Sequence, residues 1–126
     1  MNEIISTNKG PGALGPYSQA VKTANGLVFV SGQIPLVPAT GEMVAGGIEE
    51  QTTQVLENIK GILEAADCKM SDVVRCTVYL ADIGDFNTVN GIYGKYFVEN
   101  CPARVCIEVS KLPKNALVEI DAIAAK

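Results

Sequence analysis

The chain has 126 residues, of which 48% are hydrophobic and 19% charged, so it is long enough to form one globular domain spanning residues 1–126. Its formal net charge of −4 and its scattered basic residues argue against nucleic-acid binding, which needs clustered lysine or arginine. No stretch approaches the roughly 20 apolar residues of a membrane span, and the first residues lack the pattern of a signal peptide. We therefore expect a cytoplasmic protein.

The chain contains no histidine, and its four cysteines show no C-x-x-C pair. A zinc site with the usual ligand spacing is therefore not expected, and we predict neither a metal nor a cofactor. In a reducing compartment, the default state is a buried free thiol for each cysteine: Cys68, Cys76, Cys101 and Cys106.

The first third of the chain predicts short strands separated by loops rich in glycine and proline. Residues 3–7 alternate weakly, which suits an edge strand, and a loop follows at residues 9–16. Residues 17–23 and 27–33 predict two strands, and Asn25–Gly26 between them is a strong signal for a tight hairpin turn.

The middle of the chain predicts two helices and one strand. From Ile48 to Ala66 the apolar residues recur with a period typical of an amphipathic helix of about five turns. Residues 73–80 predict a strand, with Val74 among the side chains expected to face the core. Asp85 is placed to cap a second helix, whose apolar stripe runs from residue 86 to residue 97.

These elements predict an α+β domain with two layers. The strand–helix–strand unit from residue 73 to residue 110 should be parallel, which puts both helices on one face of a mixed β-sheet. The last strand, residues 118–124, is the most apolar and is expected near the centre of the sheet. A simple hairpin between it and the preceding strand is the competing placement.

The two strands near the C-terminus each have one apolar face and one mixed face. We expect the apolar residues of Val105–Val109 to point to the core, with Arg104 and Cys106 on the opposite face. In the last strand the even-numbered residues from 118 to 124 should face the core, with Glu119 opposite. A face that mixes charges with apolar side chains indicates cover by a partner chain or a ligand.

Residues 102–109 (PARVCIEV) and 118–120 (VEI) resemble the signature of the RidA (YjgF/UK-type) family of enamine/imine deaminases. Residues 15–20, 30–35 and 85–87 resemble other recurrent stretches of that family, and the resemblance runs over essentially the whole chain. It favours the central position of the last strand and implies a chorismate-mutase-like fold, assembled as a homotrimer with sites in the clefts between subunits.

Arg104 is the strongest candidate for substrate binding. Its guanidinium is suited to hold a carboxylate through two parallel hydrogen bonds, but an intersubunit salt bridge with Glu108 or Asp121 is about as plausible from the residues alone. The resemblance makes the partner a ligand. Cys106 shares a face with Arg104, and without a histidine to activate its thiol it is better suited to offer its backbone carbonyl.

Glu119 is the candidate for proton transfer. A carboxylate in a central strand is either paired with a cation, such as Arg75 or Lys111, or partly desolvated, which favours its protonated form. The residues alone favour the structural pair, whereas the resemblance favours a role in activating water. We expect Arg104 and Glu119, from neighbouring strands, to meet in one sheltered notch.

Three further segments are candidate substrate-binding elements. Tyr17 follows Gly15–Pro16, so its hydroxyl can project from a rigid turn, although packing under the loop is the commoner use of such a tyrosine. Gly32, with Ser31, can offer a backbone N–H to an anion. Asn87 lies in the first turn of the second helix, where asparagine is usually a local cap, and its role comes from the resemblance.

The resemblance implies hydrolytic deamination of reactive 2-imino or 2-enamino acids, such as 2-iminobutanoate and 2-iminopropanoate, to 2-oxo acids and ammonia. The alternative is a non-catalytic module that binds small carboxylates on the same trimeric fold. RNA cleavage, associated with some relatives, is disfavoured by the acidic net charge and the missing histidine.

Overall fold

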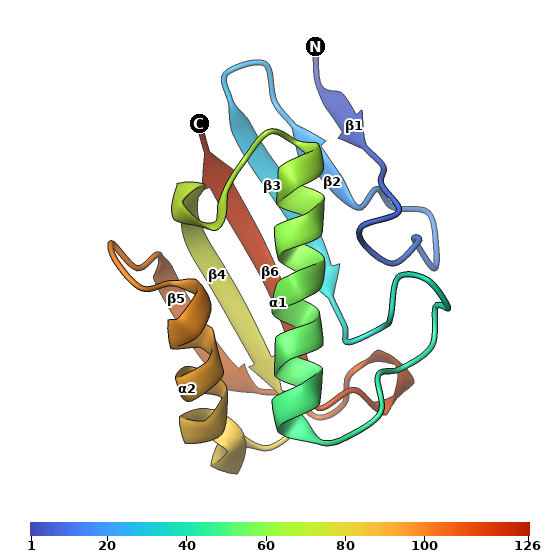
Figure 1. Ribbon diagram of the computed structural model, residues 1–126, viewed down its shortest axis with the longest axis vertical. Coiled ribbons are helices and arrows are strands. Elements are labelled where there is room, and N and C mark those ends of the chain that lie inside the picture. The colour runs from blue at the N-terminus through green and yellow to red at the C-terminus, as the bar shows by residue number, and fades with distance from the viewer.

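The computed structural model describes residues 1–126 as a six-stranded sheet with two helices packed on one face (Figure 1). The strands run in the order β1-β2-β3-β6-β4-β5; only β4 and β5 are parallel. The predicted two-layer α+β fold is therefore confirmed. The strands are β1 (Glu3–Ile5), β2 (Ala20–Lys22), β3 (Leu27–Gln33), β4 (Val73–Leu80), β5 (Ala103–Glu108) and β6 (Val118–Ala125), and the helices are α1 (Ile48–Ala65) and α2 (Phe86–Tyr96).

The last strand, β6, occupies the centre of the sheet between β3 and β4, as its apolar composition predicts. The competing hairpin with β5 is wrong, because β4 lies between the two strands. Val118, Ile120, Ala122 and Ala124 are buried along one face of β6. A strand with such a face gains most from a position where helices cover it.

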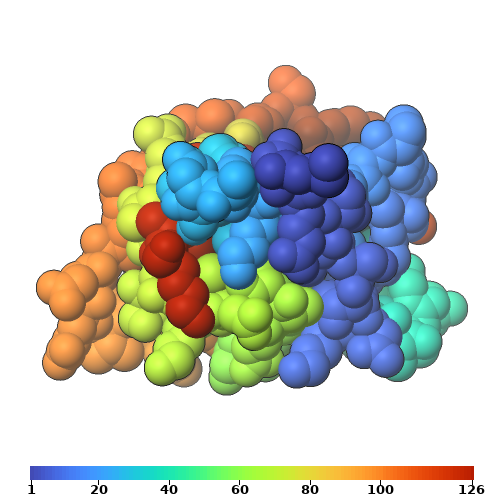
Figure 2. Space-filling model, turned by 90° about the horizontal axis from the view of Figure 1, so that it is seen from above, coloured from blue at the N-terminus to red at the C-terminus, as the bar shows by residue number.

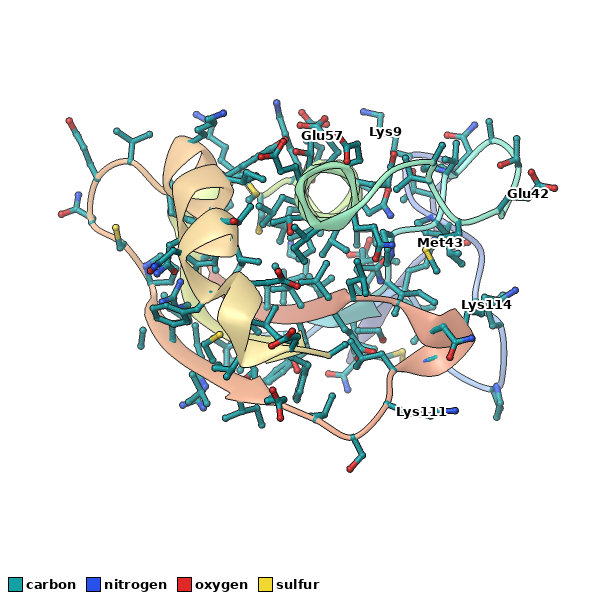
Figure 3. The ribbon with its side chains drawn as sticks, turned by 90° about the horizontal axis from the view of Figure 1, so that it is seen from below. Lys9, Glu42, Met43, Glu57, Lys111 and Lys114 are labelled. Carbon is teal, nitrogen blue, oxygen red and sulfur yellow. The ribbon has the colours of Figure 1, made fainter.

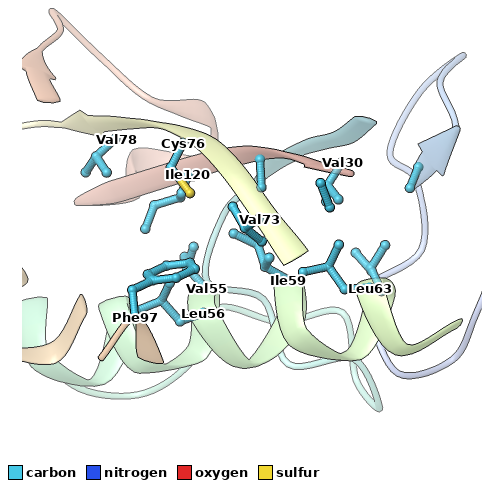
Figure 4. Packing of buried hydrophobic residues seen from close by; sticks show 14 of the residues in the cluster. Val30, Val55, Leu56, Ile59, Leu63, Val73, Cys76, Val78, Phe97 and Ile120 are labelled. Carbon is cyan, nitrogen blue, oxygen red and sulfur yellow. The ribbon is translucent and has the colours of Figure 1, made fainter. Parts of the chain in front are cut away.

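Helix α1 supplies most of the cover over this central part of the sheet. Its buried residues include Leu56 and Ile59, and Figure 4 shows this side of the helix facing Val30 and Ile120 of the sheet. Burying each large apolar side chain contributes about 1.5–3 kcal/mol relative to leaving it in water. The helices therefore cover one face of the sheet, and the opposite face of the sheet carries no helix. Neither helix is long and apolar enough to cross a membrane.

The N-terminal hairpin forms where its turn signal predicts, but its loop has three residues, 24–26, and not two, because Thr23 lies opposite Leu27. Gly26 has φ +90, a conformation that favours glycine, and its carbonyl accepts a hydrogen bond from the Lys126 N–H at 3.1 Å. The hairpin and the C-terminal residues therefore lie together at one end of the molecule (Figure 2). Strand β2 is shorter than predicted, because residues 17–19 form a loop fastened by Gln19, whose side-chain amide donates to the Pro11 carbonyl at 2.7 Å.

Two expectations about side-chain direction are wrong. Val74 is 48% exposed and Val73 is buried instead, because the pairing of β4 with β6 shifts register between residues 73 and 75. In β5, Val105 and Ile107 lie on the exposed, helix-free face. The reason is the register with β4, which places Val105 and Ile107 beside Thr77 and Tyr79 on the helix-free face, whereas the side chain of Arg104 packs on α2.

Two smaller expectations hold only in part. Asp85 occupies the N-cap position of α2, but its side chain accepts no capping hydrogen bond. Asp82 caps the short turn before α2 instead, where it accepts a hydrogen bond from the Gly84 N–H at 2.8 Å. All four cysteines are free thiols, as predicted, and Cys68 and Cys76 are buried, whereas Cys101 is exposed and Cys106 is half-buried.

Candidate active site

The carboxylate of Glu119 lies on the helix-free face of the sheet. Its neighbours in β6, Val118 and Ile120, are fully buried under the helices, so the alternation of the strand turns Glu119 to the other side. There it borders a cavity of about 470 Å³. The cavity is lined by Leu14, Gly15, Pro16, Tyr17, Ser31, Gly32, Ile34, Pro113 and Glu119. The structure thus brings together four of the predicted site residues, which we call the Glu119 region: Tyr17, Ser31, Gly32 and Glu119.

Gly32 explains why the carboxylate can lie against β3. The pairing of β3 with β6 shifts register between Val30 and Gln33, which places Gly32 beside Glu119. A Cβ atom at residue 32 would collide with Oε2 of Glu119 and stand 3.0 Å from its carboxyl carbon. A residue without a side chain is needed at this position for the observed place of the carboxylate.

The surroundings of Glu119 favour its protonated form. Burial raises the pKa of the Glu119 carboxyl, and the nearby charge of Asp121 raises it further. The chain places no lysine or arginine within 4 Å of Glu119, since the single ion pair joins Lys9 and Glu64. The predicted structural pairing of Glu119 with Arg75 or Lys111 is therefore wrong within one chain. Without a cation beside it, the Glu119 carboxyl can both accept and donate a proton.

Tyr17 and Ser31 form part of the wall of the cavity and are fixed by local hydrogen bonds. The Tyr17 hydroxyl accepts a hydrogen bond from the Leu14 N–H at 3.0 Å, which leaves its own proton for another acceptor. The Ser31 hydroxyl donates to the Ser18 carbonyl at 2.6 Å, and the Ser31 N–H donates to the Gln19 carbonyl at 3.0 Å. The Ser31 N–H is thus already paired within the chain. Of the predicted backbone donors for an anion, this leaves the N–H of Gly32.

Arg104 lies in the edge strand β5, two strands away from Glu119, and its side chain is on the other face of the sheet, directed at α2. Its Nη1 atom donates to Oδ1 of Asn90 at 2.7 Å. The guanidinium carbon is 4.9 Å from the centre of the Tyr93 ring and 5.5 Å from that of Phe86. These contacts hold a half-buried cation with no carboxylate within 4 Å in the chain. We call these four residues, with Cys106, the Arg104 region.

Sequence reasoning missed Asn90, although the sequence carries a signal for it. Phe86, Asn90 and Tyr93 have the spacing i, i+4, i+7, which places them on one face of a helix. Asn87, the predicted residue, is exposed instead and lines a groove of about 680 Å³ between α1 and α2. It does not contact Arg104 in the same chain, and its predicted role stays a prediction.

The thiol of Cys106 is poorly suited to be a nucleophile. Burial raises its pKa, and the positive charge of Arg104 only partly opposes this effect. The backbone of Cys106 is more accessible, because β5 is an edge strand. The Val109 N–H donates to the Leu80 carbonyl in β4, and backbone groups alternate along a strand, so the Cys106 carbonyl points away from β4.

The predicted notch shared by Arg104 and Glu119 does not exist within one chain. The two residues belong to strands separated by β4, and their side chains point to opposite faces of the sheet. The parallel crossover through α2 places β5 beyond β4, and this separates the two residues. One chain therefore holds a carboxyl at a cavity and a fixed cation, but not in the same place.

Comparison with known proteins gives consistent matches over the whole chain. A family model described as Endoribonuclease L-PSP matches residues 7–126. A RutC family protein from Pyrococcus horikoshii is 56% identical over 126 residues, which are 100% of this chain and 99% of that protein. The human 2-iminobutanoate/2-iminopropanoate deaminase is 50% identical over 124 residues, 98% of this chain and 90% of the human protein. The crystal structure of RidA from a Psychrobacter species has a TM-score of 0.94 and 43% identity, and the match covers 98% of this chain and 99% of that chain.

Proposed function

The chain belongs to the Endoribonuclease L-PSP (YjgF/RidA) family, and from this membership we propose that it hydrolyses reactive 2-imino acids, or their 2-enamino tautomers, to 2-oxo acids and ammonia. The observation that carries the proposal is the Glu119 carboxyl, which borders a 470 Å³ cavity with its pKa raised by burial. A carboxyl in that state is suited to accept and donate a proton. Because relatives are named 2-iminobutanoate/2-iminopropanoate deaminase, these two imino acids are the first substrates to test.

The complete site forms between two copies of the chain in a homotrimer. Arg104 of one subunit and Glu119 of its neighbour contribute the two charges, which one chain keeps on opposite faces. The helix-free face also exposes large apolar side chains, among them Phe29, Val105 and Ile107, at 38–43% of their surface. A cluster of this kind favours burial against a second copy.

The substrate carboxylate binds the free N–H groups of the Arg104 guanidinium, with the Gly32 backbone as a second donor. Asn90 and the two aromatic rings hold the guanidinium in one orientation before the substrate arrives, which lowers the entropy lost on binding. Tyr17 and Asn87 close and orient the pocket.

Hydrolysis then needs a water and three proton transfers. The Glu119 carboxylate takes a proton from a water as the water oxygen bonds to the imine carbon, and it then gives this proton to the nitrogen. As the C–N bond breaks, the carboxylate takes the remaining hydroxyl proton, so that the 2-oxo acid forms and ammonia leaves, carrying this last proton away as ammonium. The Cys106 carbonyl orients the water or the nitrogen. An iminium carbon is electrophilic by itself, so placement and proton transfer are sufficient for the reaction.

The test of the activity is a coupled assay in which threonine dehydratase releases 2-iminobutanoate. The formation of 2-oxobutanoate is timed with and without the protein, and we expect it to be faster with the wild-type chain. No acceleration would contradict the proposed function. If the Glu119→Gln variant and the wild type both bind 2-oxobutanoate and neither accelerates hydrolysis, the protein is a carboxylate-binding module.

The shared site is tested by mixing two inactive variants. Arg104→Ala and Glu119→Gln are each purified, unfolded together and refolded as an equal mixture. If each site takes one residue from each of two subunits, about a quarter of the sites in random trimers carry both native residues, and activity returns to about that level. If each site lay within one chain, every site would keep one substitution and the mixture would stay inactive. The two variants refolded separately are the matched controls.

A further inference from the structure

A second carboxylate lies beside Glu119 on the helix-free face of the sheet. Asp121 is two residues further along β6, so the two side chains leave the strand on the same side. In the adjacent strand β4, Tyr79 pairs directly with Glu119, and Thr77 pairs directly with Asp121. The four residues form a polar patch across the two strands at the centre of the sheet.

Both oxygens of Asp121 are engaged by neutral donors of β4. Oδ1 accepts a hydrogen bond from the Thr77 N–H at 3.2 Å, and Oδ2 accepts one from the Tyr79 hydroxyl at 3.1 Å. No lysine or arginine lies within 4 Å of this carboxylate in the chain. The two hydrogen bonds keep the carboxylate in one place without neutralising it.

We propose that Asp121, held by Tyr79 and Thr77, is a positioning residue whose fixed negative charge makes Glu119 a better proton acceptor. The inference rests on the proposed role of Glu119 in hydrolysis and deepens it. A negative charge that cannot move away disfavours a second negative charge beside it, so Glu119 gains a proton more readily. The pKa of Glu119 is raised first by burial and then by Asp121, in the same direction.

The other ionisable side chains near Glu119 do not cancel this effect. No ionisable side chain of strand β3 lines the cavity. Burial raises the pKa of the Tyr79 hydroxyl, and the neighbouring carboxylates raise it further, so this group stays neutral. The two lysines of the loop before β6 are exposed and project into solvent (Figure 3). The ionisable side chains on the elements around Glu119 are Tyr17 across the cavity, Tyr79 and Arg75 on β4, and Lys111 and Lys114 on the loop before β6.

This arrangement has a consequence for the order of proton transfers. When water attacks the imine, its proton moves to the Glu119 carboxylate, and a higher proton affinity of that group lowers the barrier to this step. The same proton is then passed to the departing nitrogen, a step that a higher proton affinity makes harder. Asp121 therefore favours the attack of water over the protonation of the departing nitrogen.

The experiment measures the titration of Glu119 by carbon-13 NMR of its side-chain carboxyl in the full-length protein. In the Asp121→Asn variant, which keeps an oxygen for Tyr79, we expect the midpoint to fall by about 0.5 pH unit, because one screened charge is removed while burial remains. The matched control is Glu42→Gln, which removes an exposed carboxylate in the loop before α1 and should leave the midpoint unchanged. An unchanged midpoint in Asp121→Asn would overturn the inference.

Two further measurements keep the result decisive. If Asp121→Asn does not fold, Asp121→Ser removes the same charge and retains a hydroxyl to accept from Tyr79, with the same expectation. The acidic limb of the pH profile of kcat/KM is then compared with the NMR midpoint. We expect both to move together in the Asp121 variant. A shifted midpoint with an unshifted limb would overturn the role of Glu119 in hydrolysis, whereas an unshifted midpoint overturns the role of Asp121 alone.

Discussion

The Glu119 region and the Arg104 region are built in different ways. The Glu119 region joins segments that are far apart in the sequence, the loop at residues 14–17 and strands β3 and β6, and it surrounds a cavity. The Arg104 region comes from one local unit, α2 and β5, and its cation is packed between two aromatic rings and an amide. The first region leaves space for water and a substrate, whereas the second holds one group rigidly.

This difference separates the two tasks of the proposed reaction. A guanidinium that binds a carboxylate works best when its orientation is set in advance, which local packing on a helix provides. A carboxyl that exchanges protons with water needs access to a cavity and a shifted pKa, which partial burial in the centre of a sheet provides. Substitutions that change only one of the two regions test this separation.

The largest effect is expected from Glu119→Gln. The amide has nearly the same shape but cannot accept the proton of water, so kcat should fall by about 10²–10⁴-fold. The affinity for 2-oxobutanoate should change little, because the Arg104 region is untouched. Initial rates in the coupled assay and calorimetric titration with 2-oxobutanoate measure the two quantities. An unchanged kcat would assign the proton transfer to another group.

The second prediction concerns the contact between Gly32 and Glu119. Gly32→Ala adds a methyl group where the carboxylate now lies, and a displacement of about 1 Å should lower kcat by on the order of 100-fold. Stability should change little, because the end of a flexible side chain can move. Gly12→Ala is the matched control, since nothing lies within 4 Å of a Cβ at that position. Equal activity of the two variants would show that the position of the carboxylate is unimportant.

The third prediction compares two asparagines of α2. Asn90→Ala removes the hydrogen bond to Arg104, and the loss of about 1.5 kcal/mol for a bond to a charged group should raise KM roughly tenfold. Asn87→Ala changes the other asparagine, which is exposed and does not touch Arg104 in its own chain but has a proposed role in orienting the pocket. Lys95→Ala, at an exposed position of the same helix outside both regions, is the control and should leave KM unchanged. A larger effect on KM of Asn87→Ala than of Asn90→Ala would assign the main contribution to substrate binding to Asn87.

The smallest effect is a dependence of stability on pH. Because the pKa of Glu119 is raised on folding, the folded chain binds more protons than the unfolded chain, and this stabilising contribution is lost as the pH rises through the raised pKa. Urea unfolding at about pH 7 should therefore show Glu119→Gln to be more stable than the wild type, and at about pH 4 the difference should shrink. An equal difference at both values would contradict a raised pKa.

The sequence predicted the fold more completely than the site. The period of the apolar residues predicted α1, and the apolar composition of the last strand together with the family resemblance favoured the central place of β6; both are confirmed. It failed for Val74, because a register shift reverses the direction of a side chain without changing the alternating pattern. It failed for Val105 because an edge strand has no fixed core side until a helix packs on it.

The same difference between local pattern and tertiary structure applies to the residues of the candidate site. The motif resemblance selected Tyr17, Gly32 and Glu119, and the fold places them around one cavity. No local pattern in the sequence indicates that these three residues come together. The resemblance did not select Asn90, whose contact with Arg104 depends on how α2 lies against β5. Spacing within a helix indicates which residues share a face, but not what that face will touch.

The order of residues along this chain was enough to specify its two helices and the kinds of side chain available for chemistry, because these follow from periodicity and composition over short stretches. The sequence was not enough to specify that β4 separates the guanidinium from the carboxylate, or that the two point to opposite faces. Those relations depend on which strands pair and on which face the helices cover, and such choices are settled only when distant segments compete for the same core.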